Sequence, residues 1–105
     1  MTEKDYEIAR ELKDRLSEVV QLVDFRIFGS RARGVADEYS DMDVFLEVES
    51  LDKELRNRIS DIAWEVGYKH MIVISLLVFT RNDIERSPLK ASPIVKNIVA
   101  EGVLV

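Results

Sequence analysis

The sequence predicts a small α/β (α+β) domain in which a mixed sheet of about three to four strands carries helices packed on it. Two observations predict this class. Segments with the period of amphipathic helices alternate along the chain with short runs of branched and aromatic residues, which are typical of strands. The chain has 105 residues, of which 47% are hydrophobic, and this is enough to bury the core of one domain. We therefore expect a single domain spanning residues 1–105.

The first expected helix leads into a short strand. Thr2 is the expected N-cap of this helix, and Asp5 lies in its first turn, where a negative charge favours the helix dipole. The apolar positions of the helix are Ile8, Leu12, Leu16, Val19 and Val23. Residues 24–28 are aromatic and branched and stop at Gly29, which predicts a strand that runs into a glycine turn.

Two further helices are expected. The second begins at Ser50 as its cap and ends at Gly67, which supplies the left-handed stop. Its apolar positions share one face and are Leu51, Leu55, Ile59, Ile62, Ala63 and Val66. The last begins with Ser92 as cap and Pro93 in its first position, and it ends at Gly102.

Two more strands follow from the pattern of apolar residues. Residues 41–49 alternate, so that one set of side chains points to one side and a second set to the other. The first set is Met42, Val44, Leu46 and Val48, and the second is Asp41, Asp43, Phe45 and Glu47. Residues 71–79 are apolar on both faces, which predicts a central strand covered on each side.

Composition excludes several classes of function. The 20 acidic and 15 basic residues give a net charge of −5, which disfavours a broad electrostatic surface for long nucleic acid. The chain has no cysteine and one histidine, so thiolate zinc sites, cysteine nucleophiles and His-rich metal clusters are excluded. Its longest apolar run, residues 71–79, is interrupted by Ser75 and is far too short to span a membrane. We expect a cytoplasmic protein.

Candidate functional residues lie at the ends of the first two expected strands. A Gly29-Ser30 pair after a strand lets backbone amides approach a phosphate and adds a hydroxyl donor. Asp41 and Asp43 project from the same face of the next strand, and two such carboxylates form a poor pair unless a divalent cation lies between them. Their hard oxygen ligands suit magnesium or manganese. Together these groups predict phosphoryl or nucleotidyl transfer.

Gly29-Ser30, ten intervening residues and Asp41-Met42-Asp43 resemble the GSX(10)DXD motif of the DNA polymerase beta-like nucleotidyltransferases. The short chain and the GSRARG spelling resemble the minimal nucleotidyltransferases (MNT domains) of that superfamily. The resemblance implies a polymerase beta-like core and transfer of a nucleoside monophosphate, usually AMP from ATP, with two magnesium ions. We expect Asp41 and Asp43 to be catalytic metal ligands and Gly29, Ser30 and Ser40 to bind the nucleotide. Many MNT proteins resemble the antitoxin of a pair with a helical HEPN ribonuclease toxin, which they adenylylate on a tyrosine.

One feature departs from the family pattern. A third carboxylate normally comes from a later strand, and within residues 71–79 the polar position is Ser75. Serine is a weak neutral ligand and a poor general base at pH 7. Glu47 shares the face of Asp43 but lies roughly 13 Å further along an extended strand, at about 3.3 Å per residue.

Two functional hypotheses follow. The first is a magnesium-dependent nucleotidyltransferase whose acceptor is a protein or small molecule. The second is a catalytically weak or silent nucleotide-binding module that neutralises a helical partner by forming a complex. A chain this short leaves little surface for an acceptor site, so we expect recognition to be shared with another chain or with a second copy of itself. The stretch Ile94–Val105 is either an interface or a segment that closes the core.

Several residues have two interpretations each. Arg31 and Arg33 either contact the triphosphate or acceptor, or are solvated or paired with Asp37 and Glu38. Ser40 either binds the nucleotide or shapes the turn before the strand. Ser75 is expected to be satisfied by a backbone carbonyl inside the sheet. A further set is expected to form a packing cluster rather than a base-stacking platform: Trp64, Tyr68 and His70.

Overall fold

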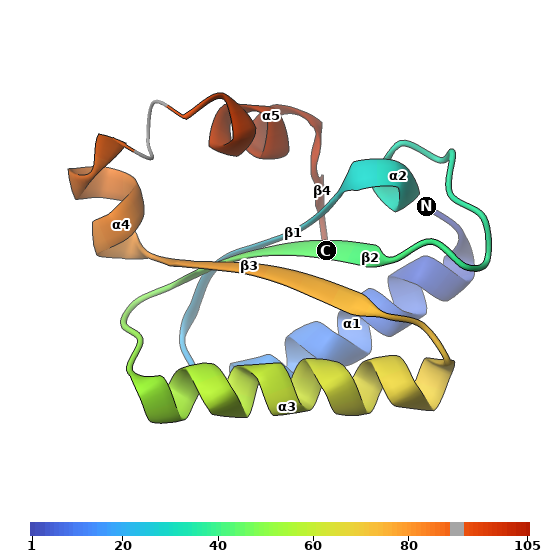
Figure 1. Cartoon of the computed structure of the whole chain (residues 1–105), viewed down its shortest axis with the longest axis horizontal. Coiled ribbons are helices and arrows are strands. Elements are labelled where there is room, and N and C mark those ends of the chain that lie inside the picture. Colours follow the sequence, from blue (N-terminus) through green and yellow to red (C-terminus); the bar gives the residue numbers. More distant parts are fainter. Residues whose placement is uncertain (89–91) are drawn as a thin grey trace.

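The computed structural model describes residues 1–88 and 92–105, and its described helices and strands follow one another around a single sheet (Figure 1). They are α1 (Glu3–Ser17), β1 (Leu22–Phe28), α2 (Gly29–Ala32), β2 (Met42–Val48), α3 (Lys53–His70), β3 (Ile74–Thr80), α4 (Arg81–Arg86), α5 (Pro93–Glu101) and β4 (Val103–Leu104). The expected mixed α+β architecture is confirmed.

The sheet has four strands in the order β3-β2-β1-β4. β1 pairs antiparallel with β2 and with β4, whereas β2 and β3 are parallel. The expectation that residues 71–79 form a central strand is wrong, because β3 is an edge strand and its residues are partly exposed. The apolar residues of β3 are therefore not explained by burial in the middle of the sheet.

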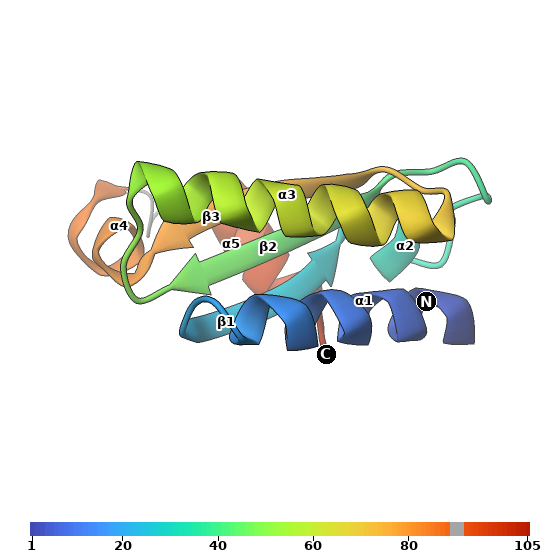
Figure 2. The ribbon, with the colours of Figure 1, turned by 90° about the horizontal axis from the view of Figure 1, so that it is seen from below.

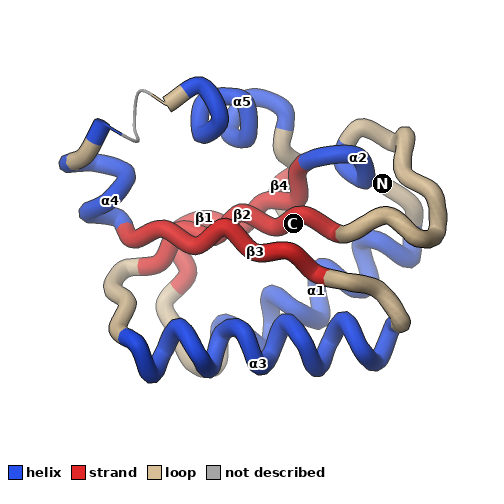
Figure 3. Tube along the Cα trace, viewed as in Figure 1, coloured by secondary structure: helices blue, strands red, loops and turns tan. Residues whose placement is uncertain are grey.

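Helices lie on both faces of the sheet (Figures 1 and 3). α1 and α3 run side by side across one face, as the view from below shows (Figure 2), and α2, α4 and α5 lie toward the other. The main core fills the space between the sheet and the first pair. It consists of Ile8, Ala9, Leu12, Leu16, Phe25, Ile27, Met42, Val44, Leu46, Ile59, Ile62, Ala63 and Val66. The alternation expected along β2 is thus confirmed for its core-facing side chains.

Helix α1 begins where the sequence predicts, but it ends earlier than expected. Thr2 accepts a hydrogen bond from the backbone N–H of Asp5, and the Asp5 carboxylate accepts one from the N–H of Thr2, which is a capping box. The helix ends at Ser17, so Val19 and Val23 lie outside it, and Val23 belongs to β1.

The limits expected for α3 are wrong at both ends. Its N-cap is Asp52 rather than Ser50, and it continues past Gly67 to His70, with Met71 as its C-cap at the left-handed φ of 58°. Gly67 is buried within the helix because the returning chain passes close to it. A Cβ there would lie 2.7 Å from the Ile72 carbonyl oxygen. The glycine therefore permits close packing and is not a stop signal.

The C-terminal part of the fold contains two elements that the sequence analysis did not predict. α4 begins at a second capping box, in which Thr80 and Asp83 exchange hydrogen bonds, and β4 adds two residues beside β1. α5 begins after Ser92 with Pro93 in its first turn and is capped at Gly102, as expected. Its Val95 and Ile98 are buried, and the helix contacts β1. Among the described residues, no helix is both long enough and apolar enough to cross a membrane.

Candidate functional site

The end of β1 and the start of β2 bring the two parts of the motif together. Phe28 is paired with Asp43 across the antiparallel ladder, so the chain leaves β1 at Gly29 beside the Asp43 side chain. Gly29 has a φ of +73°, and a Cβ at this position would lie 2.3 Å from the Oδ2 atom of Asp43. The backbone therefore approaches the carboxylate more closely than any other residue type would allow.

Ser30 follows in α2, a single helical turn that starts at Gly29. The first backbone amides of a helix have no acceptor within that helix, so they are available to other acceptors. The Ser30 hydroxyl makes no hydrogen bond to any described residue, whereas its carbonyl accepts one from Val35 N at 3.1 Å. This turn thus carries amide and hydroxyl donors and begins at Gly29, which lies beside the Asp43 carboxylate.

The two aspartates differ in their surroundings. Asp41 precedes β2 and is exposed, whereas Asp43 is partly buried within the strand. Burial raises the pKa of Asp43 above its ordinary value, the negative charge of Asp41 raises this pKa further, and the positive charge of Arg33 lowers it. A partly buried carboxylate whose ionised form is disfavoured by a neighbouring carboxylate, next to a close backbone approach, fits a divalent cation that accepts oxygen ligands.

Replacement of Asp43 by asparagine is expected to stabilise the metal-free protein slightly at neutral pH. Because the pKa of Asp43 lies above the ordinary 3.8 when folded, ionisation costs more in the folded than in the unfolded protein. The contribution of Asp43 to the free energy of unfolding therefore falls as the pH rises from about 3.8 through the folded-state pKa, and the penalty persists above it. Thermal unfolding in EDTA should show a gain for Asp43→Asn near neutral pH that disappears in acid.

The gain should be small because the Asp43 carboxylate is only partly buried. The control is Asp61→Asn, which removes an exposed carboxylate from α3. An Asp43→Asn gain that is as large in acid as at neutral pH would contradict this explanation.

The neighbouring strand carries no acid at the corresponding position. Ser75 of β3 is paired directly with Asp43, and its side chain is exposed. Glu47 is paired with Phe79 on β3 and with Asp24 on β1, four residues further along β2. Within residues 1–88 and 92–105, no three or more His, Cys, Asp or Glu side chains gather as metal ligands. The donor set at the motif thus consists of two carboxylates.

Arg31 has a structural role that neither sequence interpretation included. Its guanidinium is buried and donates to Asp5 Oδ1 at 2.7 Å and to the Ser40 carbonyl oxygen at 3.1 Å. The alternative pairing with Asp37 or Glu38 is therefore not observed for Arg31, whose guanidinium binds Asp5 and the Ser40 carbonyl instead. Because Ser40 directly precedes Asp41, this contact ties the start of β2 to α1.

Ser40 and Arg33 complete the loop. The Ser40 hydroxyl contacts Asp37 Oδ1 at 3.2 Å and accepts a hydrogen bond from the Asp37 amide, so it shapes the turn. Its assignment as a nucleotide ligand stays a prediction. Arg33 is exposed, and its charge acts on Asp43. Sequence spacing gave no signal for the Asp5 to Arg31 contact, because the residues are 26 positions apart.

The expectation of a packing cluster is wrong for two of its members, Trp64 and Tyr68. Trp64 and Tyr68 stack on each other with centroids 5.2 Å apart, but they are 68% and 73% exposed. The His70 ring is largely buried, with its Nε2 3.3 Å from the carboxylate of Glu11. The aromatic pair thus lies on the surface of α3, away from the core.

Comparisons with known proteins agree with this geometry. Residues 7–105 match the family model of the nucleotidyltransferase domain. No curated protein matches the chain. Among solved structures, a nucleotidyltransferase candidate from Sulfolobus solfataricus has a TM-score of 0.54 at 17% identity, covering 96% of this chain and 78% of its own.

Two other structural neighbours are described as toxin–antitoxin assemblies. One, with AMP-PNP, has a TM-score of 0.54 at 19% identity, covering 95% of this chain and 70% of its own. The other, a mutant of MntA-HpeT, has a TM-score of 0.56 at 20% identity and covers 96% and 70%. The neighbours share the fold, and the family model spans nearly the whole chain. The protein therefore belongs to the nucleotidyltransferase domain family, as its GSX(10)DXD motif predicted.

Proposed function

We propose that this protein transfers AMP from ATP to an acceptor protein in a magnesium-dependent reaction. The observation that carries the proposal is the contact between Gly29 and Asp43, because it joins a phosphate-accessible backbone to a metal-competent carboxylate. Two carboxylates together with substrate phosphates form a ligand set in which magnesium is commonly bound. Bound there, the metal would neutralise charge that develops on the phosphate oxygens.

The roles of the residues follow from their positions. Asp41 and Asp43 would hold the metal, for which manganese is an alternative, and the second magnesium ion expected from the family would share these carboxylates. The Gly29 backbone and the Ser30 hydroxyl would hold the β and γ phosphates. Ser40 would contribute at the start of β2. Catalysis would consist mainly of positioning and charge stabilisation, as in other phosphoryl transfers.

We further propose that the protein is the antitoxin of a HEPN/MNT pair and adenylylates its toxin in the cytoplasm. Neighbours described as toxin–antitoxin assemblies, one of them with AMP-PNP, support both the nucleotide and the partner. The net charge of −5 favours a protein acceptor over a long polynucleotide.

The test is calorimetric titration with a non-hydrolysable ATP analogue, with and without magnesium. The wild type should bind in a magnesium-dependent manner, and the Asp41→Asn/Asp43→Asn variant should bind about 100-fold more weakly or not at all. The matched control is Asp14→Asn/Asp61→Asn, which makes the same change in net charge at two exposed positions on α1 and α3. Unchanged binding and transfer by the Asp41/Asp43 variant would refute the proposal.

A second candidate function is favoured by Ser75, which stands beside Asp43 without a carboxylate. In this alternative the protein binds nucleotide weakly or without turnover and blocks a helical partner by forming a stable complex. This alternative predicts that the activity of the partner stays blocked when Asp41 and Asp43 are both replaced by asparagine. Inhibition that requires ATP and both aspartates would exclude it, and a gain of transfer activity in Ser75→Asp would identify the missing acid as the cause of slow turnover.

A further inference from the structure

The free edge of β3 is an open hydrogen-bonding surface. The Met42 amide donates to the Val73 carbonyl at 2.9 Å, and the parallel register pairs Met42 with Ile74. Alternate residues of a parallel strand bond to the same neighbour, so the backbone groups of Ser75 and Leu77 face β2. Those of Ile74, Leu76 and Val78 therefore face outward, where the sheet order of the described residues places no further strand.

This edge lacks the usual protection against pairing. Natural edge strands are commonly shielded by charged residues, proline or bulges. β3 has the sequence ISLLVFT, which contains no charge and no proline, and its register with β2 is continuous from Ile74 to Thr80. An edge of this kind favours addition of another strand.

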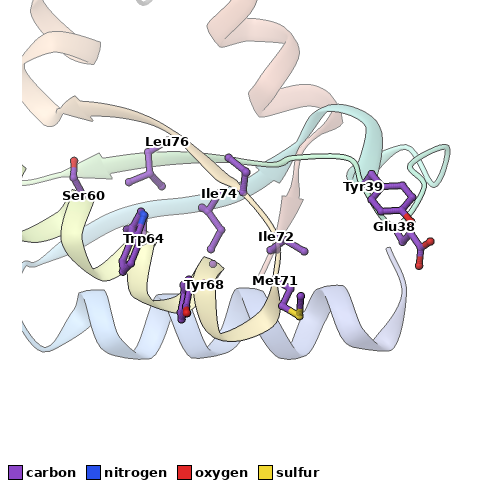
Figure 4. Close-up of a pocket in the computed structure, with 12 residues that line it drawn as sticks. Glu38, Tyr39, Ser60, Trp64, Tyr68, Met71, Ile72, Ile74 and Leu76 are labelled. Atoms are coloured by element: carbon purple, nitrogen blue, oxygen red, sulfur yellow. The ribbon is translucent and has the colours of Figure 1, made fainter.

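A groove of about 930 Å³ runs between this edge and α3. Its exposed apolar lining includes the stacked Trp64 and Tyr68, together with Met71 at 90% and Val73 at 63% exposure. Figure 4 shows the two rings on the flank of α3 beside β3, with Leu76 across from Trp64 and Ser60 further along the groove. Contiguous exposed apolar surface beside an open strand edge is typical of a protein interface.

We propose that two copies of this chain associate here through antiparallel β3 strands, forming one continuous sheet across a two-fold axis. An isologous contact requires the surface to be complementary to itself. Ser60 and Leu76 line the same groove, and they lie near the middle of α3 and of β3 respectively. One axis can therefore relate both elements to their copies, with Leu76 and Val78 exchanging hydrogen bonds across the dyad near Leu77.

The charges along α3 favour a second copy of this chain, rather than a strand of an unrelated protein, as the partner of this edge. Helical spacing places Lys53 and Arg56 on the same flank as Ser60, Trp64 and Tyr68. When two α3 helices lie antiparallel about Ser60, the basic half of each faces the aromatic half of the other. Neither cation forms an ion pair with any described residue. Each is thus available for a cation–π contact across the axis.

The dimer would leave the candidate catalytic site open. Asp43 and its neighbour Ser75 lie on the sheet face opposite the core that α3 covers. The proposed association is therefore independent of the proposed transferase function, and either can fail without the other.

Light scattering and the emission of Trp64, the single tryptophan of the chain, test the proposal. Between about 1 and 300 µM the wild type should pass from one chain mass to two. Its emission should shift to the blue over the same range, as the exposed indole becomes buried. Val73→Lys should weaken association at least tenfold while retaining Trp64 as the probe, and Arg56→Glu should weaken it similarly.

The matched control is Ile94→Glu, which charges another exposed apolar position, on α5 (54% exposed, against 63% for Val73). Circular dichroism checks that each variant is folded. A wild type that stays monomeric over the whole range, or a dimer that Val73→Lys and Arg56→Glu leave intact, would overturn the proposal. Ile94→Glu that weakens association as much as Val73→Lys does would also overturn the proposal, because the interface would then not lie specifically at β3.

Discussion

Replacement of Gly29 by alanine is expected to abolish magnesium-dependent nucleotide binding in a protein that still folds. The positive φ of 73° at Gly29 costs an alanine about 1–2 kcal/mol. The added Cβ would also lie 2.3 Å from Asp43 Oδ2 and 3.2 Å from its Cγ, so the carboxylate must move. Displacing this short side chain is compatible with folding, whereas it removes the metal ligand from its place beside the backbone amides.

Gly34 offers a matched control for this experiment. Its φ of +74° is nearly the same, but a Cβ at Gly34 would meet no atom within 4 Å. Both alanine variants should therefore lose a similar free energy of unfolding, measured by chemical denaturation. Calorimetric titration should show that Gly34→Ala retains nucleotide affinity and that Gly29→Ala loses it. Comparable binding by the two variants would mean that the contact between Gly29 and Asp43 does not organise the site.

The sequence was informative where local patterns determine structure. The alternation over residues 41–49 correctly separated the core-facing side chains of β2 from Asp43 and Glu47. The motif correctly placed Gly29 directly after one strand and Asp43 on the next, and these two strands, β1 and β2, are paired in the sheet. In both cases the information lies within a few residues, because the period of a strand fixes the face of each side chain.

Local patterns failed where distant segments decide the structure. Gly67 looked like a helix end, but the chain uses it to let Ile72 pass close to α3. The apolar run of β3 looked like a buried central strand, whereas its position in the sheet is set by pairing with β2 alone. The start of α4 was recognisable in principle, since Thr80 and Asp83 have the spacing of a capping box. β4 is two residues long, too short for any periodic signal.

Removal of the Arg31 guanidinium is expected to produce the largest loss of stability of any substitution between β1 and β2. Arg31 and Asp5 have side chains that are 8% and 6% exposed. Removing one partner of such a pair leaves a buried charge without compensation and costs about 3–5 kcal/mol. Chemical denaturation of Arg31→Met should show this loss, while Arg33→Met, at an exposed neighbour, should change stability by less than about 0.5 kcal/mol.

The double variant Arg31→Met/Asp5→Asn separates the stranded charge from the lost contacts. Asparagine keeps an oxygen that can accept from the Thr2 amide, so the capping box is largely retained. If desolvated charge dominates the loss, the second substitution should recover much of the stability, although the Ser40 carbonyl still lacks its two hydrogen bonds from Arg31. A double variant less stable than Arg31→Met would show that the lost hydrogen bonds dominate.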